Sequence, residues 1–327
     1  MDILDIVRSK STTWTYVEIP ADRTPAGLMR DPISPGQYYM SATLRSFRIP
    51  DVRVLFTKFY GTVHSYSEIQ TGTGDTAKLQ TVTTPQQLQS ADPTHLDRTL
   101  VQNIPLLGPV PFTGGNFVIQ IGLFAVKETD LAGPYLNLLG TIASKASISY
   151  LSQAVQLAQP ILDGVNAIVE SSAGGLQIGL YKGFVQPDLP TQGYYAIVAV
   201  PSGQIDISHL AIDNSERLVY FDSRKEIDAA YLVFTIERFT QRTDWRQIPE
   251  VKDSYADIHA AGKTRDKTKI GDAFTAFRVT VDNCLDLLDA DQTTIVNTVQ
   301  AEVNKLLGAL GTGHPEPLPQ LRDLSLP

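Results

Sequence analysis

The stretch that decides the fold is FVIQIGLFAV, which runs from Phe117 to Val126. β-Branched and aromatic residues dominate it, and both of its alternating faces are apolar. Such a run predicts a strand in the centre of a sheet, because only a central strand has both faces covered. The pair Gly114-Gly115 comes shortly before it and predicts the turn that leads into the strand.

Segments on either side alternate between apolar and polar residues with the period of two that is typical of half-buried strands. These strand candidates are residues 13–19, 38–44, 52–60, 79–83, 176–181, 193–200, 218–221 and 230–239. Pro105, Pro109 and Pro111 donate no ladder hydrogen bond, so residues 105–111 are expected at a sheet edge or in a crossover. Residues 222–225 are expected to form a hairpin turn.

One short pattern occurs twice. Residues 176–181 repeat the pattern of residues 119–124, and each copy follows a Gly-Gly pair. We interpret the repeat as two core strands of one sheet that have similar packing demands, with a duplicated hairpin as the alternative.

Between these two copies lies a helical pattern that is almost free of charge. From Leu131 to Val169 only Lys145 and Asp163 are formally charged. A helix on a water-soluble protein normally shows one charged face, so its own domain, a second copy, another protein or a lipid surface must cover this segment. We therefore predict a helical insertion at residues 130–173 that acts as a contact surface. Its contact residues are Leu136, Leu139, Ile142, Leu151, Val155 and Ile161.

After Pro249 the pattern becomes that of ordinary amphipathic helices. Apolar residues recur at spacings of three and four in two stripes, Phe274, Phe277, Val281, Leu285 and Leu288, then Ile295, Val299, Val303, Leu306 and Leu310. The sequence thus predicts an α+β protein with a mostly antiparallel β-sandwich or open barrel. We expect the sandwich domain at residues 1–249, a C-terminal helical appendage at 250–310 and a disordered tail at 311–327.

Composition limits the classes of function. Apolar residues make up 43% of the 327 residues, which suffices for a core, and the formal net charge of −8 argues against nucleic-acid binding. The densest basic run, residues 263–269, holds no aromatic residue and is expected to be a solvated linker. The single cysteine, Cys284, excludes an internal disulfide and fits a reducing cytosol. We expect a soluble, cytoplasmic protein, because the acidic start lacks the pattern of a signal peptide and the longest apolar run is about half a membrane span.

One block resembles a known group of sequences. The run LGPVPFTGG at residues 107–115, followed by GLFAVK at residues 122–127, is similar to the central block of an uncharacterised bacterial protein family. The resemblance implies a bacterial origin and one continuous domain plan. It implies no catalytic residue, because no activity is associated with that block.

Three loop motifs resemble ligand sites only in part. Gly262-Lys263-Thr264 resembles the end of a phosphate-binding loop, but Asp257 stands where that motif needs its first glycine. Residues 72–75 could form an anion-binding nest, but a simple turn is the preferred interpretation. Three metal-compatible side chains lie within six residues, namely Asp92, His95 and Asp97, and there a capped turn is preferred over a metal site.

For the other reactive side chains, a structural interpretation also stands beside each functional one. Cys284 lies on an apolar stripe and is expected to be a buried structural cysteine. Glu68, Glu237 and Asp213 could supply an acid–base pair in the fold, although their spacing gives no support. A basic group near the start of the sheet could receive an acidic partner or a lipid headgroup, with a solvated strand face as the simpler alternative. It consists of Arg45, Arg48, Arg53 and Lys58.

The sequence therefore favours an interaction protein over an enzyme. Our leading hypothesis is a non-enzymatic interaction or assembly protein, an adaptor or structural subunit, that binds a protein partner or forms a homo-oligomer. We expect no catalytic residue, cofactor or metal. Two alternatives stay open, namely a protein that binds or inserts into a membrane and an enzyme whose site is assembled from distant residues.

Overall fold

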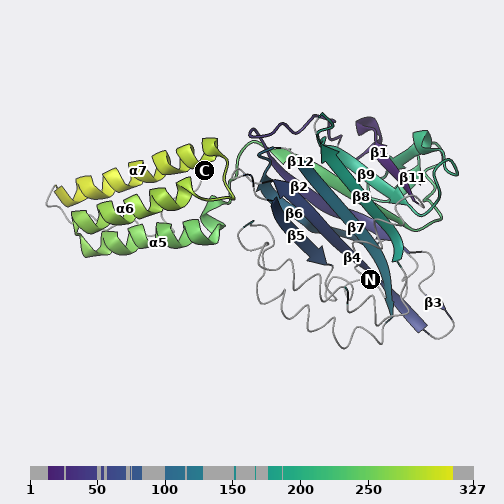
Figure 1. Ribbon diagram of the computed structural model, residues 1–327, viewed down its shortest axis with the longest axis horizontal. Helices are drawn as coiled ribbons and strands as arrows, with labels where there is room; N and C mark the ends of the chain where they lie inside the picture. Colours follow the sequence, from purple (N-terminus) through teal and green to yellow (C-terminus); the bar gives the residue numbers. More distant parts are fainter. Residues whose placement is uncertain are drawn as a thin grey trace. The chain divides into compact units, whose positions relative to one another are not determined.

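The chain folds into two compact units in the computed structural model, Met1–Thr240 and Gln241–Pro327. The structure describes residues 14–25, 27–49, 53–54, 57–70, 74, 76–82, 100–114, 116–127, 151, 166, 176–185 and 187–311. The first unit is a β-sandwich and the second is a group of three helices (Figure 1). We call them the sandwich unit and the helical unit.

The first sheet of the sandwich unit is antiparallel and has the strand order β1-β9-β12-β2-β6. Its strands are β1 (Thr15–Ile19), β9 (Gly193–Val198), β12 (Tyr231–Phe239), β2 (Tyr39–Arg48) and β6 (Leu100–Pro111). β6 contains the three prolines and ends the sheet, as predicted, because an edge strand needs no ladder donor on its outer side.

The second sheet is also antiparallel and places β7 (Asn116–Lys127) between β4 and β8. The predicted central strand is thus confirmed. Its other strands are β3 (Arg53–Val54), β4 (Thr57–Gln70), β5 (Thr76–Val82) and β8 (Leu176–Val185), and both β3 and β5 pair with β4. The described strands form an α+β fold of antiparallel sheets and do not close into a barrel.

The repeated pattern belongs to β7 and β8, which are adjacent strands of this sheet. Gly122 and Gly179 lie opposite each other in the register. A Cβ on Gly122 would come within 2.5 Å of the ring of Phe124, so glycine is needed where that ring crosses the strand. The interpretation as two core strands of one sheet is confirmed.

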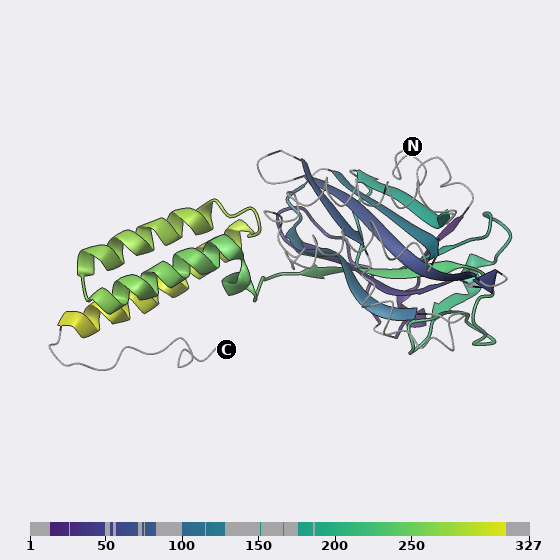
Figure 2. The ribbon, with the colours of Figure 1, turned by 90° about the horizontal axis from the view of Figure 1, so that it is seen from below.

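The main core lies between the two sheets (Figure 2). Phe47 and Phe234 enter it from the first sheet, and Phe117 and Ile121 enter it from the second. These four side chains are at most 1% exposed. Leu151 is buried in the same cluster and is 2% exposed.

A second, smaller core covers the outer face of β1, β9 and β12. It is completed by the hairpin of β10 (Leu210–Ile212) and β11 (Leu218–Tyr220). A turn follows β11 at the predicted place, where Arg224 adopts a φ of 55°. The short 3-10 helices of this unit are η2 (Ala21–Arg23) and η4 (Ile207–His209).

The helical unit consists of η5 (Trp245–Gln247), α5 (Pro249–Thr264), α6 (Lys267–Asp282) and α7 (Asp289–Gly311). Its core includes Trp245, Tyr255 and Phe277, whose rings contact one another edge-on or tilted. The predicted change to helix after Pro249 is confirmed. Among described helices, none is long and apolar enough to cross a bilayer.

Two details of the sequence prediction are wrong in this unit. α6 ends at Asp282, so Leu285 lies in the following loop and is 44% exposed instead of continuing the apolar stripe. Residues 263–269 are exposed as expected, but they form the turn between α5 and α6 and the adjoining helix ends rather than a linker. The αL conformation of Arg265 ends α5, and the carboxylate of Asp266 caps α6.

Candidate functional site

The first candidate site lies on the outer face of the first sheet, at an irregularity of β2. Val233 pairs with Ser46 and Phe234 with Leu44, so Arg45 is an extra residue between two pairs. The pairing of β2 with β6 is also irregular between Leu44 and Ser46. Met40, Ala42 and Leu44 face the core before the bulge and Phe47 faces it afterwards, so the bulge shifts the alternation of β2 by one residue. Bulges are common next to functional sites.

The bulge allows the Arg45 guanidinium to bind three side chains from two neighbouring strands. Its Nη2 lies 2.6 Å from Glu237 Oε1, its Nε donates to Thr235 Oγ1 at 3.1 Å, and its Nη1 donates to Asn103 Oδ1 at 2.9 Å. Asn103 adopts a φ of 42°, which is uncommon for a residue with a side chain. The positive charge is therefore held by partners within the chain.

Glu216 reaches the same site from the loop between β10 and β11. It adopts a φ of 58°, and its Oε1 accepts a hydrogen bond from Tyr194 Oη at 3.1 Å. Burial raises the pKa of Glu216, and the nearby charges of Asp213 and Glu237 raise it further, against the lowering effect of Tyr194 and Arg45. Its Oε2 is buried and has no hydrogen-bond partner among the described residues.

We call this group the bulge network, and its members are Arg45, Asn103, Tyr194, Glu216, Thr235 and Glu237. It joins the carboxylate of Glu237, which is bound by a guanidinium, with the carboxyl group of Glu216, whose pKa is raised by burial. Two carboxyl groups in different environments can act as base and acid. The structure brings Glu237 and Asp213 into the surroundings of Glu216, whereas Glu68 lies on β4 beside Tyr66. Sequence spacing gave no signal for Glu216 or Asn103.

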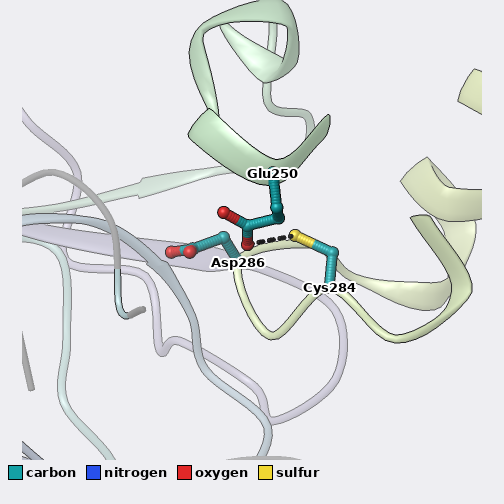
Figure 3. Close-up of side chains that lie close together, drawn as sticks. All are labelled: Glu250, Cys284 and Asp286. Carbon is teal, nitrogen blue, oxygen red and sulfur yellow. Dashed lines mark hydrogen bonds between the residues drawn. The ribbon is translucent and has the colours of Figure 1, made fainter. Parts of the chain in front are cut away.

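The second candidate site lies in the helical unit and gathers Glu250, Cys284 and Asp286 (Figure 3). One ligand-type atom from each of these residues lies within 4.8 Å of the others. The Cys284 thiol donates to Glu250 Oε1 at 3.5 Å. Burial raises the pKa of Cys284 to about 12, helped by the negative charges of Asp286 and Glu250. The thiol is therefore protonated at neutral pH and is a poor nucleophile.

A guanidinium also belongs to this second site. Arg242, whose side chain is 1% exposed, places Nη1 at 3.4 Å from Asp286 Oδ1 and 3.2 Å from the Asp286 carbonyl. Its Nε donates to Asp244, and its backbone N–H donates to Asp291 Oδ2 at 2.7 Å. A metal ion here would have to deprotonate the thiol and compete with this guanidinium. We interpret the group as a structural network that ties residue 242 to the loop between α6 and α7, which agrees with the predicted buried cysteine.

The third candidate site is the opposite end of the helical unit. Lys263, Arg265, Lys267 and Lys269 are all exposed there. The ion pairs of the described helical unit use Arg242 and Arg246, and none of them involves these four cations. The basic run is thus a concentrated positive surface without an ion-pair partner among the described residues.

The end of α7 lies beside this basic turn. A Cβ on Gly262 would approach Leu306 Cδ1 to 3.9 Å, and both ribbon views show α7 reaching past the ends of α5 and α6 (Figures 1 and 2). The predicted stripe of α7 is buried at Ile295, Val299 and Val303. Farther along it, Leu306 and Leu310 are only partly buried, as is the neighbouring Leu307. We call residues 263–269 and 305–310 together the helical tip.

The remaining sequence candidates give no site. Arg48 is bound by Asp228 at 3.0 Å and by the Ile227 carbonyl at 2.8 Å. Gly262-Lys263-Thr264 lies at the end of α5 and not after a strand, as a phosphate-binding loop requires.

Other candidates lie outside the described residues or side chains. Most of the turn at 72–75 and all of the group Asp92, His95 and Asp97 are outside the described part, as are Leu136, Leu139, Ile142, Val155 and Ile161. The same holds for the side chains of Arg53 and Lys58. The proposed contact role of the insertion stays a prediction, and Leu151, its one described contact residue, packs in the sandwich core.

Comparisons with protein-family models, with curated proteins and with solved structures find no match to this chain.

Proposed function

We propose that the chain is a non-enzymatic interaction protein, an adaptor or a structural subunit, whose helical unit makes the contact. The observation that carries this proposal is the helical tip, where four exposed cations lie beside partly exposed leucines. These cations form no ion pair among the described residues, and exposed charge of this kind is available to an external partner. Partly exposed leucines at the same place add apolar area that such a contact would bury.

The charges of the sandwich unit support the proposal by contrast. Arg45 is bound by Glu237, Arg48 by Asp228, and Arg238 Nη2 lies 2.7 Å from Asp31 Oδ2. These arginines are held on the sandwich surface and are less available to a partner. The low-charge segment between residues 131 and 169 would supply a second contact surface, which we propose on the sequence pattern.

Light scattering of the purified chain across a range of concentrations tests the proposal, together with titration against any partner encoded beside it. The double variant Lys263→Glu/Lys267→Glu should weaken assembly or partner binding. Lys252→Glu/Arg278→Glu, which makes the same charge change on exposed residues of the same unit, should leave it unchanged. A strict monomer that binds no partner in solution would remove the assembly role.

A second function is favoured by one specific observation, the unequal carboxyl groups of the bulge network. Glu216 as acid and Glu237 as base would fit a hydrolase. Chromogenic glycosides and esters test this, since turnover that Glu216→Gln and Glu237→Gln both abolish would establish an enzyme. Turnover that neither variant lowers would exclude this site as its source.

A further inference from the structure

We infer that the helical tip docks on a lipid bilayer that carries anionic headgroups. This inference rests on the proposed function and names the partner of the same surface. Three observations support it. They are the concentration of cations, the presence of an arginine at a left-handed position in the turn between α5 and α6, and the extension of α7 past α5.

The cations are concentrated in a short turn. Lys263, Arg265, Lys267 and Lys269 lie within seven residues, and Asp266 is the only acid among them. The Asp266 carboxylate accepts hydrogen bonds from the backbone N–H groups of Thr268 and Lys269, so it is directed into α6. Each basic residue close to an anionic membrane strengthens binding by roughly fivefold. The tip therefore attracts anionic headgroups electrostatically.

Arg265 adopts a backbone conformation that is unfavourable for a residue with a side chain. It ends α5 with a φ of 57°, the left-handed conformation that helix ends usually give to glycine. A side chain at this position lowers the stability of the turn. The chain nevertheless places an exposed arginine in this turn, which fits a residue kept for contact rather than for folding.

α7 is longer than α5 and α6 and extends past α5 at the helical tip. It has 23 residues, whereas α5 and α6 have 16 each. Leu306 lies opposite Gly262, which is two residues before the end of α5, whereas α7 continues for five residues after Leu306. At a rise of 1.5 Å per residue, α7 therefore extends roughly 4–5 Å past α5 at the tip. Leu307 and Leu310, in this last part of α7, are both only partly buried. Leucines beside cations are the pattern of a segment that lies in a membrane interface.

The same observations distinguish a bilayer from nucleic acid. No aromatic residue lies within residues 263–269 or 305–310 to stack on a base, whereas partly exposed leucines lie beside the cations. Besides Asp266, the nearest exposed acids on α5 and α6 are Asp272, one turn after Lys269, and Asp257, about 9 Å before Lys263 along α5. The helical tip itself carries five cations, Lys305 included, against the single carboxylate of Asp266, so positive charge is in excess there.

Vesicle flotation tests the inference with the full chain. We expect it to float with vesicles of phosphatidylcholine and phosphatidylglycerol, to stay behind with phosphatidylcholine alone, and to be released by high salt. Lys263→Glu/Lys267→Glu should weaken binding at least about tenfold, and Leu307→Ser/Leu310→Ser should weaken it to a smaller extent. Lys252→Glu/Arg278→Glu should bind as the unchanged chain does.

Arg265→Gly gives a variant that cannot fail through misfolding of the turn, because glycine suits the left-handed position. It should bind anionic vesicles roughly fivefold more weakly while its thermal unfolding temperature stays the same or rises. No flotation of the unchanged chain, equal binding to neutral vesicles, or equal losses in the control variant would overturn the inference. Binding to an oligonucleotide but to no vesicle would also overturn it. If flotation fails while Lys263→Glu/Lys267→Glu still lowers the mass seen by light scattering, the proposed interaction function stands without the membrane.

Discussion

The sandwich unit and the helical unit differ in how their positively charged side chains are paired. On the sandwich, Arg45 and Arg238 are fixed by carboxylates that neighbouring elements hold at hydrogen-bond distance. In the helical unit, Arg242 is buried and paired, whereas the cations of the helical tip are exposed and form no ion pair among the described residues. The contrast separates charge that maintains the fold from charge that is available for binding.

The largest effect should come from Arg242→Met, which removes the charge paired with Asp286. Both side chains are at most 1% exposed, so the carboxylate would be left buried without its guanidinium. Loss of one partner of a buried pair typically costs about 3–5 kcal/mol. Urea unfolding followed by circular dichroism at 222 nm, which reports mainly the helices, measures this loss. Arg278→Met, on an exposed face of α6, is the control and should change stability by less than about 0.5 kcal/mol.

A smaller effect is expected in the sandwich, where Gly122→Ala would force the Phe124 ring away from β7. Overpacking of this kind typically costs about 1–3 kcal/mol. Gly183→Ala is the matched control on β8, because no atom lies within 4 Å of the added Cβ. Equal unfolding temperatures for the two variants would show that the close approach of Phe124 to β7 does not exist in solution.

Glu216→Gln should change the pH dependence of the free energy of unfolding more than its value at any one pH. The folded-state pKa of Glu216 is raised above the ordinary value of 4.5, mainly by burial. Its contribution to stability is thus complete below pH 4.5 and is lost as the pH rises through the raised value. The variant cannot ionise, so it should gain stability relative to the unchanged chain across that range. A difference in unfolding free energy that stays constant with pH would show that Glu216 titrates normally.

The smallest effect concerns Cys284, whose buried thiol has a pKa of about 12. Iodoacetamide at pH 8 should label it slowly in the native chain and at the rate of a free cysteine in denaturant. Fast native labelling would mean that the thiol is exposed and that the network of Figure 3 is open.

Sequence patterns predicted the parts of the fold that depend on local chemistry. Apolar periodicity located β7 in the centre of its sheet, and the prolines of β6 indicated an edge, because both rules act within one strand. Cys284 is buried as predicted, although it lies in the loop after α6 and not on a helical stripe.

The candidate sites depend on pairing between distant residues, which periodicity does not encode. Glu216 meets Tyr194 through the placement of a hairpin, and Arg242 meets Asp286 across 44 residues. The helical tip was visible as a basic run, but its position beside the end of α7 follows only from helix lengths and packing. For the same reason Leu285 could not be excluded from the helical stripe before the end of α6 was known.

Hydrogen–deuterium exchange of the full chain with anionic and with neutral vesicles tests the central claim most directly. The account predicts slower exchange only with anionic vesicles, confined to residues 263–269 and 305–310, with no change around Arg45 and Arg48. Protection of the sandwich arginines without protection of these two segments would contradict it.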